Sequence, residues 1–321
     1  MTRSRWGWLR LACGLAVLGV LLMRLGSGPF LHGISTIDGW SLAAGAAITV
    51  PTTACCAWRW RRIARGLGVG LPLRTAILAY YRSQFLNTAL PGGVLGDVHR
   101  GLVHGRDTGE TARALRSVAW DRVIGQVVQI VITLGVLLVF PSPFRSSVPG
   151  LAAALVVVVL LVVLVGRLRP GDRAPRWARV VRGARADLRT GLLARGSWPG
   201  IGLASAGAVT GYVAIFLVAA RTAGATVPTT RLLPLALFVL VATAIPANVA
   251  GWGPREGAAA WSFAAAGLGA EQGVATAVVY GVIVLVASLP GAAVLVVTWL
   301  QRREPGREPL AGAGQEGASR G

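Results

Sequence analysis

The sequence contains no lysine: all 32 basic residues are arginine, and only 12 residues are acidic. Cysteine is also scarce. Cys13 stands alone and Cys55 and Cys56 are adjacent, which fits neither a metal site nor a disulfide framework. The motifs G-x-S-x-G and H-E-x-x-H and a P-loop are missing as well. We therefore expect a protein that is not an enzyme and that holds no metal and no cofactor.

Long polar stretches are absent too. The polar segments, roughly 92–117, 167–198 and 301–321, are too short or too basic to form a separate soluble domain. The sequence is 54% hydrophobic and contains apolar runs of about 17–25 residues, the length that a helix needs to cross a bilayer. This composition predicts an all-α polytopic membrane protein in which residues 1–300 form a single transmembrane domain.

The arginines, which give a net charge of +20, cluster in the gaps between the apolar runs. A basic chain can bind nucleic acid, but this placement follows the positive-inside rule of membrane topology. We expect no nucleic-acid partner, and we expect a multi-pass protein of the cell membrane with both termini in the cytoplasm. Tryptophans near the run ends, such as Trp40, Trp58 and Trp60, predict belts at the membrane interfaces.

The apolar runs predict six full transmembrane helices and two broken or re-entrant elements. The expected spans are an uncleaved first run that ends near residue 25, followed by runs at about 40–58, 118–140, 149–166, 199–220 and 273–299. Of the broken elements, 73–91 is expected to enter and leave on the cytoplasmic side, and 232–268 to enter from outside. Opposite entry sides would suit an inverted repeat.

Two further segments are expected to lie outside the spans. Segment 168–198 carries apolar residues at helical spacing on one face and arginines on the other. It is therefore either an amphipathic helix on the inner membrane surface or only a topology signal. Residues 301–321 are rich in Gly, Glu and Arg and are expected to form a disordered cytoplasmic tail.

Two proline-glycine breaks interrupt the apolar sequence with matched spacing. After Pro91 and after Pro246, valine stands at the third position, glycine at the fifth and arginine at the ninth. Such breaks leave backbone groups unpaired, which a membrane protein tolerates only where the backbone is buried in protein or lines a watery cavity. Paired breaks indicate a transporter-like binding site. The alternative is a pair of simple kinks with ion pairs that stabilise helix packing.

The candidate binding residues lie at these breaks and at the start of one span. Glycines let the first break turn, and Arg100 offers a planar fork for phosphate, with Asp97 expected to pair with it. The predicted substrate-binding residues are Asn87, Pro91, Gly92, Gly93, Gly96, Asp97, Arg100, Asp121, Arg122, Pro246, Asn248, Gly251, Gly253, Arg255 and Glu256.

Neighbouring residues add three expectations. Arg255 and Glu256 are adjacent, so we expect them to point apart on a helix instead of pairing directly. Asp121 and Arg122 begin a span and are expected to complete the cluster. A membrane-embedded transferase that uses Asp97 or His99 on a lipid is a further alternative.

These motifs resemble the lysylphosphatidylglycerol synthase transmembrane-domain family, also called flippase-like, over about residues 40–300. The matching segments run Asn87-x-x-x-Pro91-Gly92-Gly93-x-x-Gly96-Asp97-x-x-Arg100, then Ser117-Val118-x-x-Asp121-Arg122-x-x-Gly125, then Pro246 through Gly257. One departure is Tyr280-Gly281, where members of the family often carry Tyr-Arg.

The resemblance implies movement of lipid between leaflets. Bifunctional relatives add a soluble aminoacyl-transferase domain, which we do not expect in this chain because it ends soon after its last span. We expect a flippase or lipid-linked transporter in which Arg100, Arg122 and Arg255 hold an anionic headgroup. The alternative is a membrane anchor or accessory subunit for a separate lipid-modifying or glycosyl-transferring enzyme, which would dock on 168–198.

Overall fold

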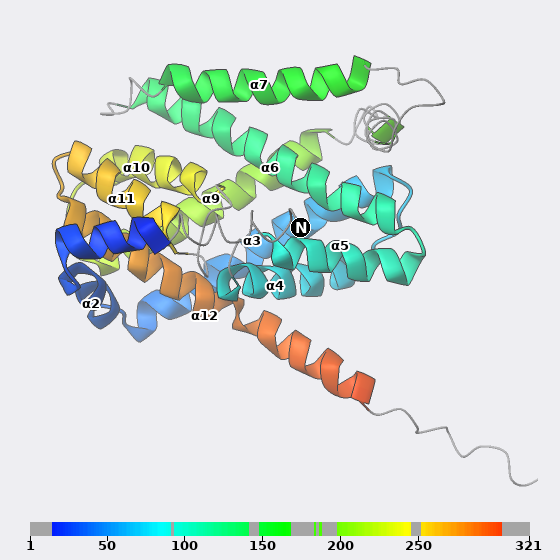
Figure 1. The fold of residues 1–321 in the computed structure, drawn as a ribbon, viewed down its shortest axis with the longest axis horizontal. Helices are drawn as coiled ribbons and strands as arrows, with labels where there is room; N and C mark the ends of the chain where they lie inside the picture. The colour runs from blue at the N-terminus through cyan, green and yellow to red at the C-terminus, as the bar shows by residue number, and fades with distance from the viewer. Residues whose placement is uncertain are drawn as a thin grey trace, which may run out of the picture.

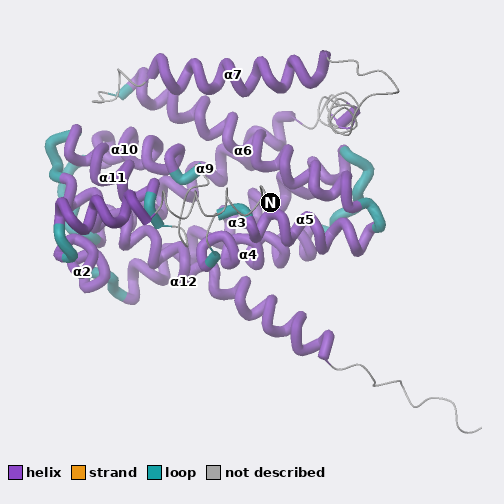
Figure 2. The backbone as a smooth tube through the Cα atoms, in the orientation of Figure 1, coloured by secondary structure: helices purple, strands orange, loops and turns teal. Residues whose placement is uncertain are grey.

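The computed structural model of the chain describes residues 15–90, 93–140, 148–167, 183, 186–187, 198–244 and 252–303. Over these ranges the chain is built of helices joined by short loops (Figure 1; Figure 2). Besides a first helix at Leu15–Leu25, the helices are α2 (Gly28–Ser35), α3 (Gly39–Gly66), α4 (Leu73–Ala89), α5 (Leu95–Thr108), α6 (Thr111–Val139), α7 (Val148–Arg167), α9 (Trp198–Thr222), α10 (Thr229–Ala242), α11 (Pro254–Ala265) and α12 (Ala270–Arg303).

Several of these helices are suited to crossing a membrane. α3, α6, α9 and most of α12 are long and apolar enough to do so. A fifth span arises if Leu15–Leu25 and α2, which meet at 96°, cross together. These findings confirm a helical chain with multiple spans. The number of six full spans stays a prediction, because the described residues provide four such helices, or five with the bent pair.

Short helices lie at both predicted broken elements. α4 falls within 73–91 and α5 follows beyond that range, whereas α10 overlaps 232–268 and α11 lies within it. α4 has 17 residues, α5 and α10 have 14 each and α11 has 12. At about 1.5 Å per residue, each is shorter than the hydrocarbon core of about 30 Å. Figure 1 shows α4 and α5 toward one end of the molecule and α10 and α11 toward the other. The breaks themselves, residues 91–92 and 245–251, lie outside the described residues, and the inverted repeat stays a prediction.

Local sequence explains where the main helices begin. Asp38 caps α3, because its Oδ1 accepts the backbone N–H of Ser41 at 2.8 Å and the Ser41 hydroxyl accepts that of Asp38 at 3.3 Å. α11 begins after Gly253, whose φ of 120° is open to glycine alone among common residues. Pro254 then supplies a favourable first helical residue. The sequence Gly-Pro-Arg-Glu thus fixes the end of the second break.

Close helix crossings hold the fold together. α12 packs against α2, α3, α4, α9 and α11, and α3 packs along α9. Glycine allows the backbones to approach: a Cβ on Gly45 would lie 2.1 Å from Ile283, and a Cβ on Gly211 would lie 2.0 Å from Thr52. Small residues at such crossings are the usual means of helix packing in membranes.

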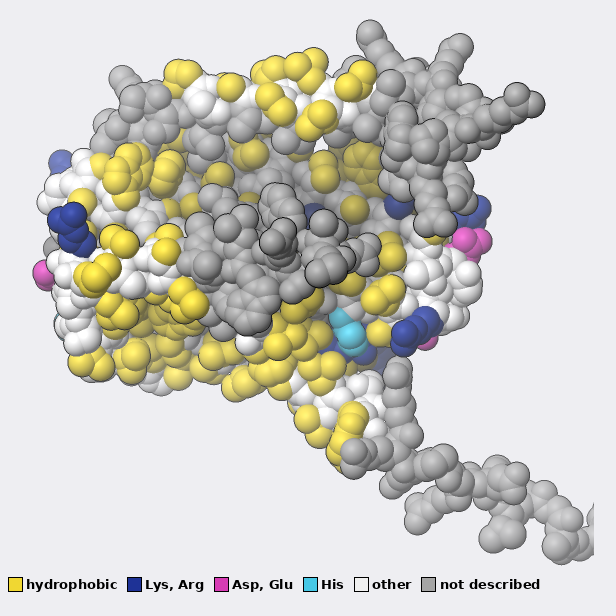
Figure 3. Space-filling view, viewed as in Figure 1, with side chains coloured by type: hydrophobic (Ala, Val, Ile, Leu, Met, Phe, Trp, Pro, Cys, Tyr) yellow, Lys and Arg dark blue, Asp and Glu magenta, His cyan; other side chains and the backbone are white. Residues whose placement is uncertain are grey.

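The surface matches a protein embedded in lipid. In the view of Figure 3, hydrophobic side chains cover much of the middle of the molecule, and charged side chains gather toward its two ends. The exposed hydrophobic side chains of the protein include many leucines and valines and Trp40. An apolar belt with charged ends is what a bilayer requires.

The predicted segments 168–198 and 301–321 fall largely outside the described residues. Of 168–198, the structure describes residues 183, 186–187 and 198. Asp187 accepts hydrogen bonds from Arg116 at 2.6 and 3.2 Å and from Trp120 at 3.3 Å. This contact ties one point of the segment to α6.

Candidate functional site

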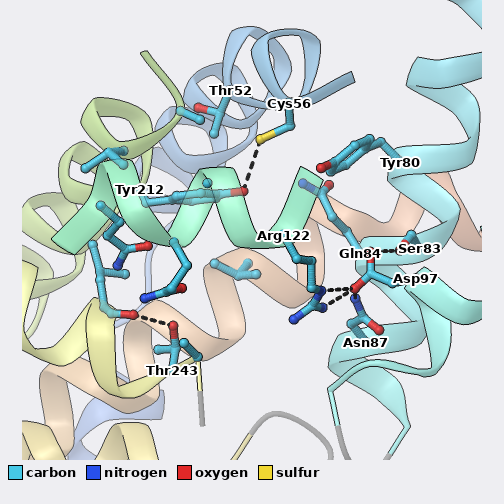
Figure 4. A pocket seen from close by; sticks show the side chains of 18 of the residues that line it. Thr52, Cys56, Tyr80, Ser83, Gln84, Asn87, Asp97, Arg122, Tyr212 and Thr243 are labelled. Atoms are coloured by element: carbon cyan, nitrogen blue, oxygen red, sulfur yellow. Dashed lines mark hydrogen bonds and ion pairs between the residues drawn. The ribbon is translucent and has the colours of Figure 1, made fainter. Parts of the chain in front are cut away.

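A cavity of about 520 Å³ lies among helices α3, α4, α5, α6, α9, α10, α11 and α12 (Figure 4). Its walls include residues that flank both breaks: Gly93 at the first, and Ala244 and Arg255 at the second. Described residues that flank the two breaks, more than 150 positions apart in the sequence, therefore border the same space.

A buried carboxylate forms the centre of one wall. Asp121 of α6 accepts from Arg59 Nε of α3 at 2.7 Å and from Arg100 Nη2 of α5 at 2.9 Å. The hydroxyl of Tyr80 on α4 also donates to it. Because Asp121 has 0% of its surface exposed, each of these contacts replaces a hydrogen bond to water. A single aspartate thus joins four helices.

Asp97 forms a second centre at the start of α5. Its Oδ1 accepts from Arg100 Nε at 2.9 Å, so the predicted pair is present. Its Oδ2 accepts from Arg122 Nε at 2.6 Å (Figure 4). Ser83 and Asn87 of α4 also donate to Asp97, at 3.1 and 3.0 Å. The carboxylate therefore retains several partners if any one of them is removed.

Arg100 is held too firmly to be the most accessible cation. Its guanidinium carbon lies 4.5 Å from the ring centre of Trp60 and 4.1 Å from that of Tyr80. Only 1% of the Arg100 side chain is exposed. Trp60 is fully buried, and its Nε1 donates to Ser117 at 3.0 Å. The prediction that Trp60 belongs to an interfacial belt is therefore wrong, because this ring supports Arg100 inside the protein.

Arg122 is the more accessible arginine of this wall. Its side chain is 42% exposed, and its Nη2 donates to the backbone carbonyl of Gly93 at 2.9 Å. Gly93 has a φ of 59°, the left-handed conformation that glycine adopts readily. Arg122 therefore reaches from α6 to the turn of the first break while part of it still faces open space.

At the second break, Arg255 and Glu256 pair directly, so the prediction that they point apart is wrong. Glu256 Oε1 accepts from Arg255 Nε at 2.9 Å and from Nη2 at 2.5 Å. The cause is the helix start: Glu256 is the third residue of α11 and turns back, so that its Oε2 accepts the N–H of Gly253 at 2.6 Å. This turn brings its other oxygen to the neighbouring guanidinium.

Gly281 makes room for Arg255. A Cβ on Gly281 would lie 2.3 Å from Arg255 Nη2. The guanidinium carbon also lies 5.6 Å from the ring centre of Tyr280 and 5.3 Å from that of Trp252. The Tyr280-Gly281 sequence, where the resembling family often has Tyr-Arg, is thus the place that accommodates Arg255.

The predicted site residues fall into three groups. The cavity wall contains Asn87, Gly93, Asp97, Arg100, Asp121, Arg122 and Arg255. Supporting positions are held by Gly96, whose N–H donates to Asn87 Oδ1 at 2.8 Å, and by Gly253 and Glu256, which start α11. Five residues lie outside the described part of the chain: Pro91, Gly92, Pro246, Asn248 and Gly251.

Sequence reasoning missed several wall residues, of which Arg59 matters most. It directly follows the predicted span 40–58 and so belongs to the arginines expected between the apolar runs, yet it is buried and bonded to Asp121. Its guanidinium lies about 3.0 Å from where a Cβ on Gly125 would be. A signal was available, because polar or small side chains recur along one face of α3 at helical spacing and all line the cavity: Thr49, Thr52, Cys56 and Arg59.

A family model described as lysylphosphatidylglycerol synthase TM region matches residues 7–291 of the 321. No curated protein and no solved structure matches the chain.

Proposed function

The chain belongs to the lysylphosphatidylglycerol synthase TM region family, and from this premise we propose that it is a lipid flippase or lipid-linked transporter. The matched region is a transmembrane region, and the proposal assigns no catalytic step to it. In this role an arginine-lined cavity binds the anionic headgroup of a membrane lipid and shields it from the hydrocarbon core.

One observation carries the proposal: arginines associated with both breaks line a single cavity. Arg122 contacts the turn of the first break, and Arg255 follows the second. A charged group at the centre of a bilayer costs at least about 2.5–3.5 kcal/mol. A polar chamber that receives the headgroup removes much of this cost, and the acyl chains can remain in lipid.

The proposal includes a topology. Six spans and the two short helix pairs would lie in the cell membrane, with both termini in the cytoplasm and the pairs entering from opposite sides. Support comes from the short lengths of α4, α5, α10 and α11 and from their placement toward opposite ends of the molecule (Figure 1). Such paired elements are typical of transporters built from inverted repeats.

The proposal is tested with purified protein in vesicles of phosphatidylcholine that contain a trace of phosphatidylglycerol labelled on its acyl chain. Dithionite bleaches only the label in the outer leaflet, so translocation appears as bleaching beyond one half. We expect the full chain to accelerate this, and Arg122→Ala to reduce the rate at least tenfold.

Arg113→Ala is the matched control, since Arg113 also lies on α6 but forms only an exposed pair with Glu110. It should keep the full rate. Bleaching by the full chain that does not exceed protein-free vesicles would refute the flippase role.

The alternative role as a membrane anchor has a limited basis. Its proposed docking surface, 168–198, is described at four positions, and Asp187 is directed to Arg116 and Trp120 of the same chain. An anchor gives no translocation by the purified full chain, so the vesicle measurement separates the two roles.

A further inference from the structure

The charges around the cavity specify the kind of headgroup that it accepts, if the proposed function holds. Among the described residues, the charged side chains that line the cavity are four arginines and two aspartates: Arg59, Arg100, Arg122, Arg255, Asp97 and Asp121. A third carboxylate, that of Glu256, is buried and bonded to Arg255. Three carboxylates against four guanidinium groups leave one positive charge. Neither break adds to this, because positions 91–92 and 245–251 carry no ionisable side chain.

We propose that the cavity selects a lipid with a single phosphodiester charge and an otherwise uncharged headgroup, and disfavours lipids that carry an amine. The spare positive charge is matched by one phosphodiester. An ammonium group would meet net positive charge, and like charges at close range are unfavourable, more so where water is scarce.

Arg122 is the residue that can receive the phosphate. It is the half-exposed member of its cluster, and its planar fork suits a phosphate oxygen pair. If Arg122 turns to the ligand, Asp97 still accepts from Arg100, Ser83 and Asn87. No buried carboxylate is left without partners, so the exchange avoids the large cost of an unpaired buried charge.

Each carboxylate around the described part of the cavity already accepts hydrogen bonds from the protein, and Asp97 accepts them from Arg100, Arg122, Ser83 and Asn87. Asp121 is fully buried and accepts from Arg59, Arg100 and Tyr80. Glu256 is fully buried and accepts from Arg255 and Gly253. Both are therefore saturated by donors from the protein itself.

Uncharged polar side chains line the rest of the chamber. Amides and hydroxyls face it from several helices, including those of Gln84, Gln126, Gln129, Thr243 and Ser288. Such groups donate to and accept from hydroxyls equally well. A headgroup of the polyol type is therefore the chemical class that matches both the charge and the hydrogen-bonding character of the walls.

The inference is tested by comparing three acyl-labelled lipids in the same phosphatidylcholine vesicles: phosphatidylglycerol, phosphatidylethanolamine and lysylphosphatidylglycerol. With the wild-type chain, phosphatidylglycerol should move at least tenfold faster than lysylphosphatidylglycerol, and phosphatidylethanolamine should also be slower. Equal rates, or a faster amine lipid, would overturn the selectivity while leaving the flippase role intact.

A variant that adds a negative charge to the cavity sharpens the test. Gln126 lines the cavity one helical turn after Arg122, where a carboxylate would cancel the spare charge. In Gln126→Glu the preference for phosphatidylglycerol over lysylphosphatidylglycerol should fall from at least tenfold to about onefold. Ala112→Glu adds the same charge at an exposed position at the start of α6, outside the cavity lining, and should retain the preference. An unchanged preference in Gln126→Glu would contradict the charge argument.

A binding measurement separates the two proposals. The midpoint temperature of thermal unfolding is measured for the full chain in detergent, alone, with added dioctanoyl phosphatidylglycerol and with added dioctanoyl phosphatidylethanolamine. If no lipid is translocated but only the glycerol lipid raises the midpoint, the flippase role fails and the headgroup selectivity stands. If neither lipid raises it and none is translocated, both proposals fail.

Discussion

At the scale of single residues, Asp121 is expected to contribute strongly to stability. It is fully buried and balances Arg59 and Arg100, which are themselves almost completely enclosed. Asp121→Asn keeps the shape but removes the charge. Because breaking a buried ion pair leaves an uncompensated charge, we expect the free energy of unfolding to fall by about 3–5 kcal/mol. Reversible unfolding in mixed detergent–SDS micelles measures this change.

Glu110→Gln, at the residue that precedes the same helix, is the matched control. Glu110 pairs with Arg113 at 3.3 Å, but both side chains are about half exposed, 48% and 49%. Such a pair contributes about 0–1 kcal/mol. Similar losses in the two variants would show that the Asp121 network does not carry the stability assigned to it.

At the scale of elements, the contact of α11 with α12 depends on two glycines with different surroundings. A Cβ on Gly273 would lie 2.3 Å from the backbone oxygen of Ala259, which cannot move without shifting α11. The three atoms nearest to a Cβ on Gly281 all belong to the guanidinium of Arg255, which can move. The first substitution should therefore affect packing, and the second should affect the cavity.

We expect Gly273→Ala to lower the free energy of unfolding by about 1–3 kcal/mol, as overpacking does. Gly281→Ala should displace Arg255 and reduce translocation of phosphatidylglycerol at least tenfold, with a smaller loss of stability. Unfolding and vesicle measurements on both variants check this contrast. Gly135→Ala serves as the control because nothing lies within 4 Å of the added methyl group. A Gly281→Ala variant with the full translocation rate would argue against a role for the Arg255 position.

At the scale of the whole molecule, the proposed topology places α2 and the start of α12 outside the cell and the turn between α5 and α6 in the cytoplasm. Figure 1 shows these two regions at opposite ends. In a background without the native cysteines, a membrane-impermeant maleimide should label Ser35→Cys and Glu271→Cys in intact cells. It should label Glu110→Cys only after lysis. All three positions are exposed, so accessibility within the protein does not decide the result.

The reverse labelling pattern would invert the topology, and labelling of all three positions in intact cells would place both ends outside. Either result would contradict the positive-inside assignment.

How far the sequence predicted this molecule depends on which contacts are local. Helical class, the position of α6 and α9 and the Asp97–Arg100 pair follow from periodicity and from a spacing of three residues along one helix. The ion pair between Asp121 and Arg59 joins positions 62 residues apart. It depends on how α3 packs against α6, and periodicity does not predict that packing.

Two errors have local physical causes. Trp60 stands at the end of an apolar run, as an interfacial tryptophan would, but the rotation of α3 turns it inward against Arg100. Arg255 and Glu256 do point apart in the interior of an ideal helix, but they stand in the first turn of α11, where the free N–H of Gly253 draws the carboxylate back. Helix ends therefore limit arguments that assume regular helical geometry.

The bond from Arg122 to the Gly93 carbonyl has one more implication. The same guanidinium that faces the chamber also steadies the bend that precedes α5. Any ligand that binds Arg122 competes with that carbonyl. Ligand binding in the cavity and the conformation of the bend at Gly93 must therefore influence each other equally, as reciprocal linkage demands. A substitution that stiffens the bend should accordingly alter the affinity of the cavity for its ligand without contacting that ligand.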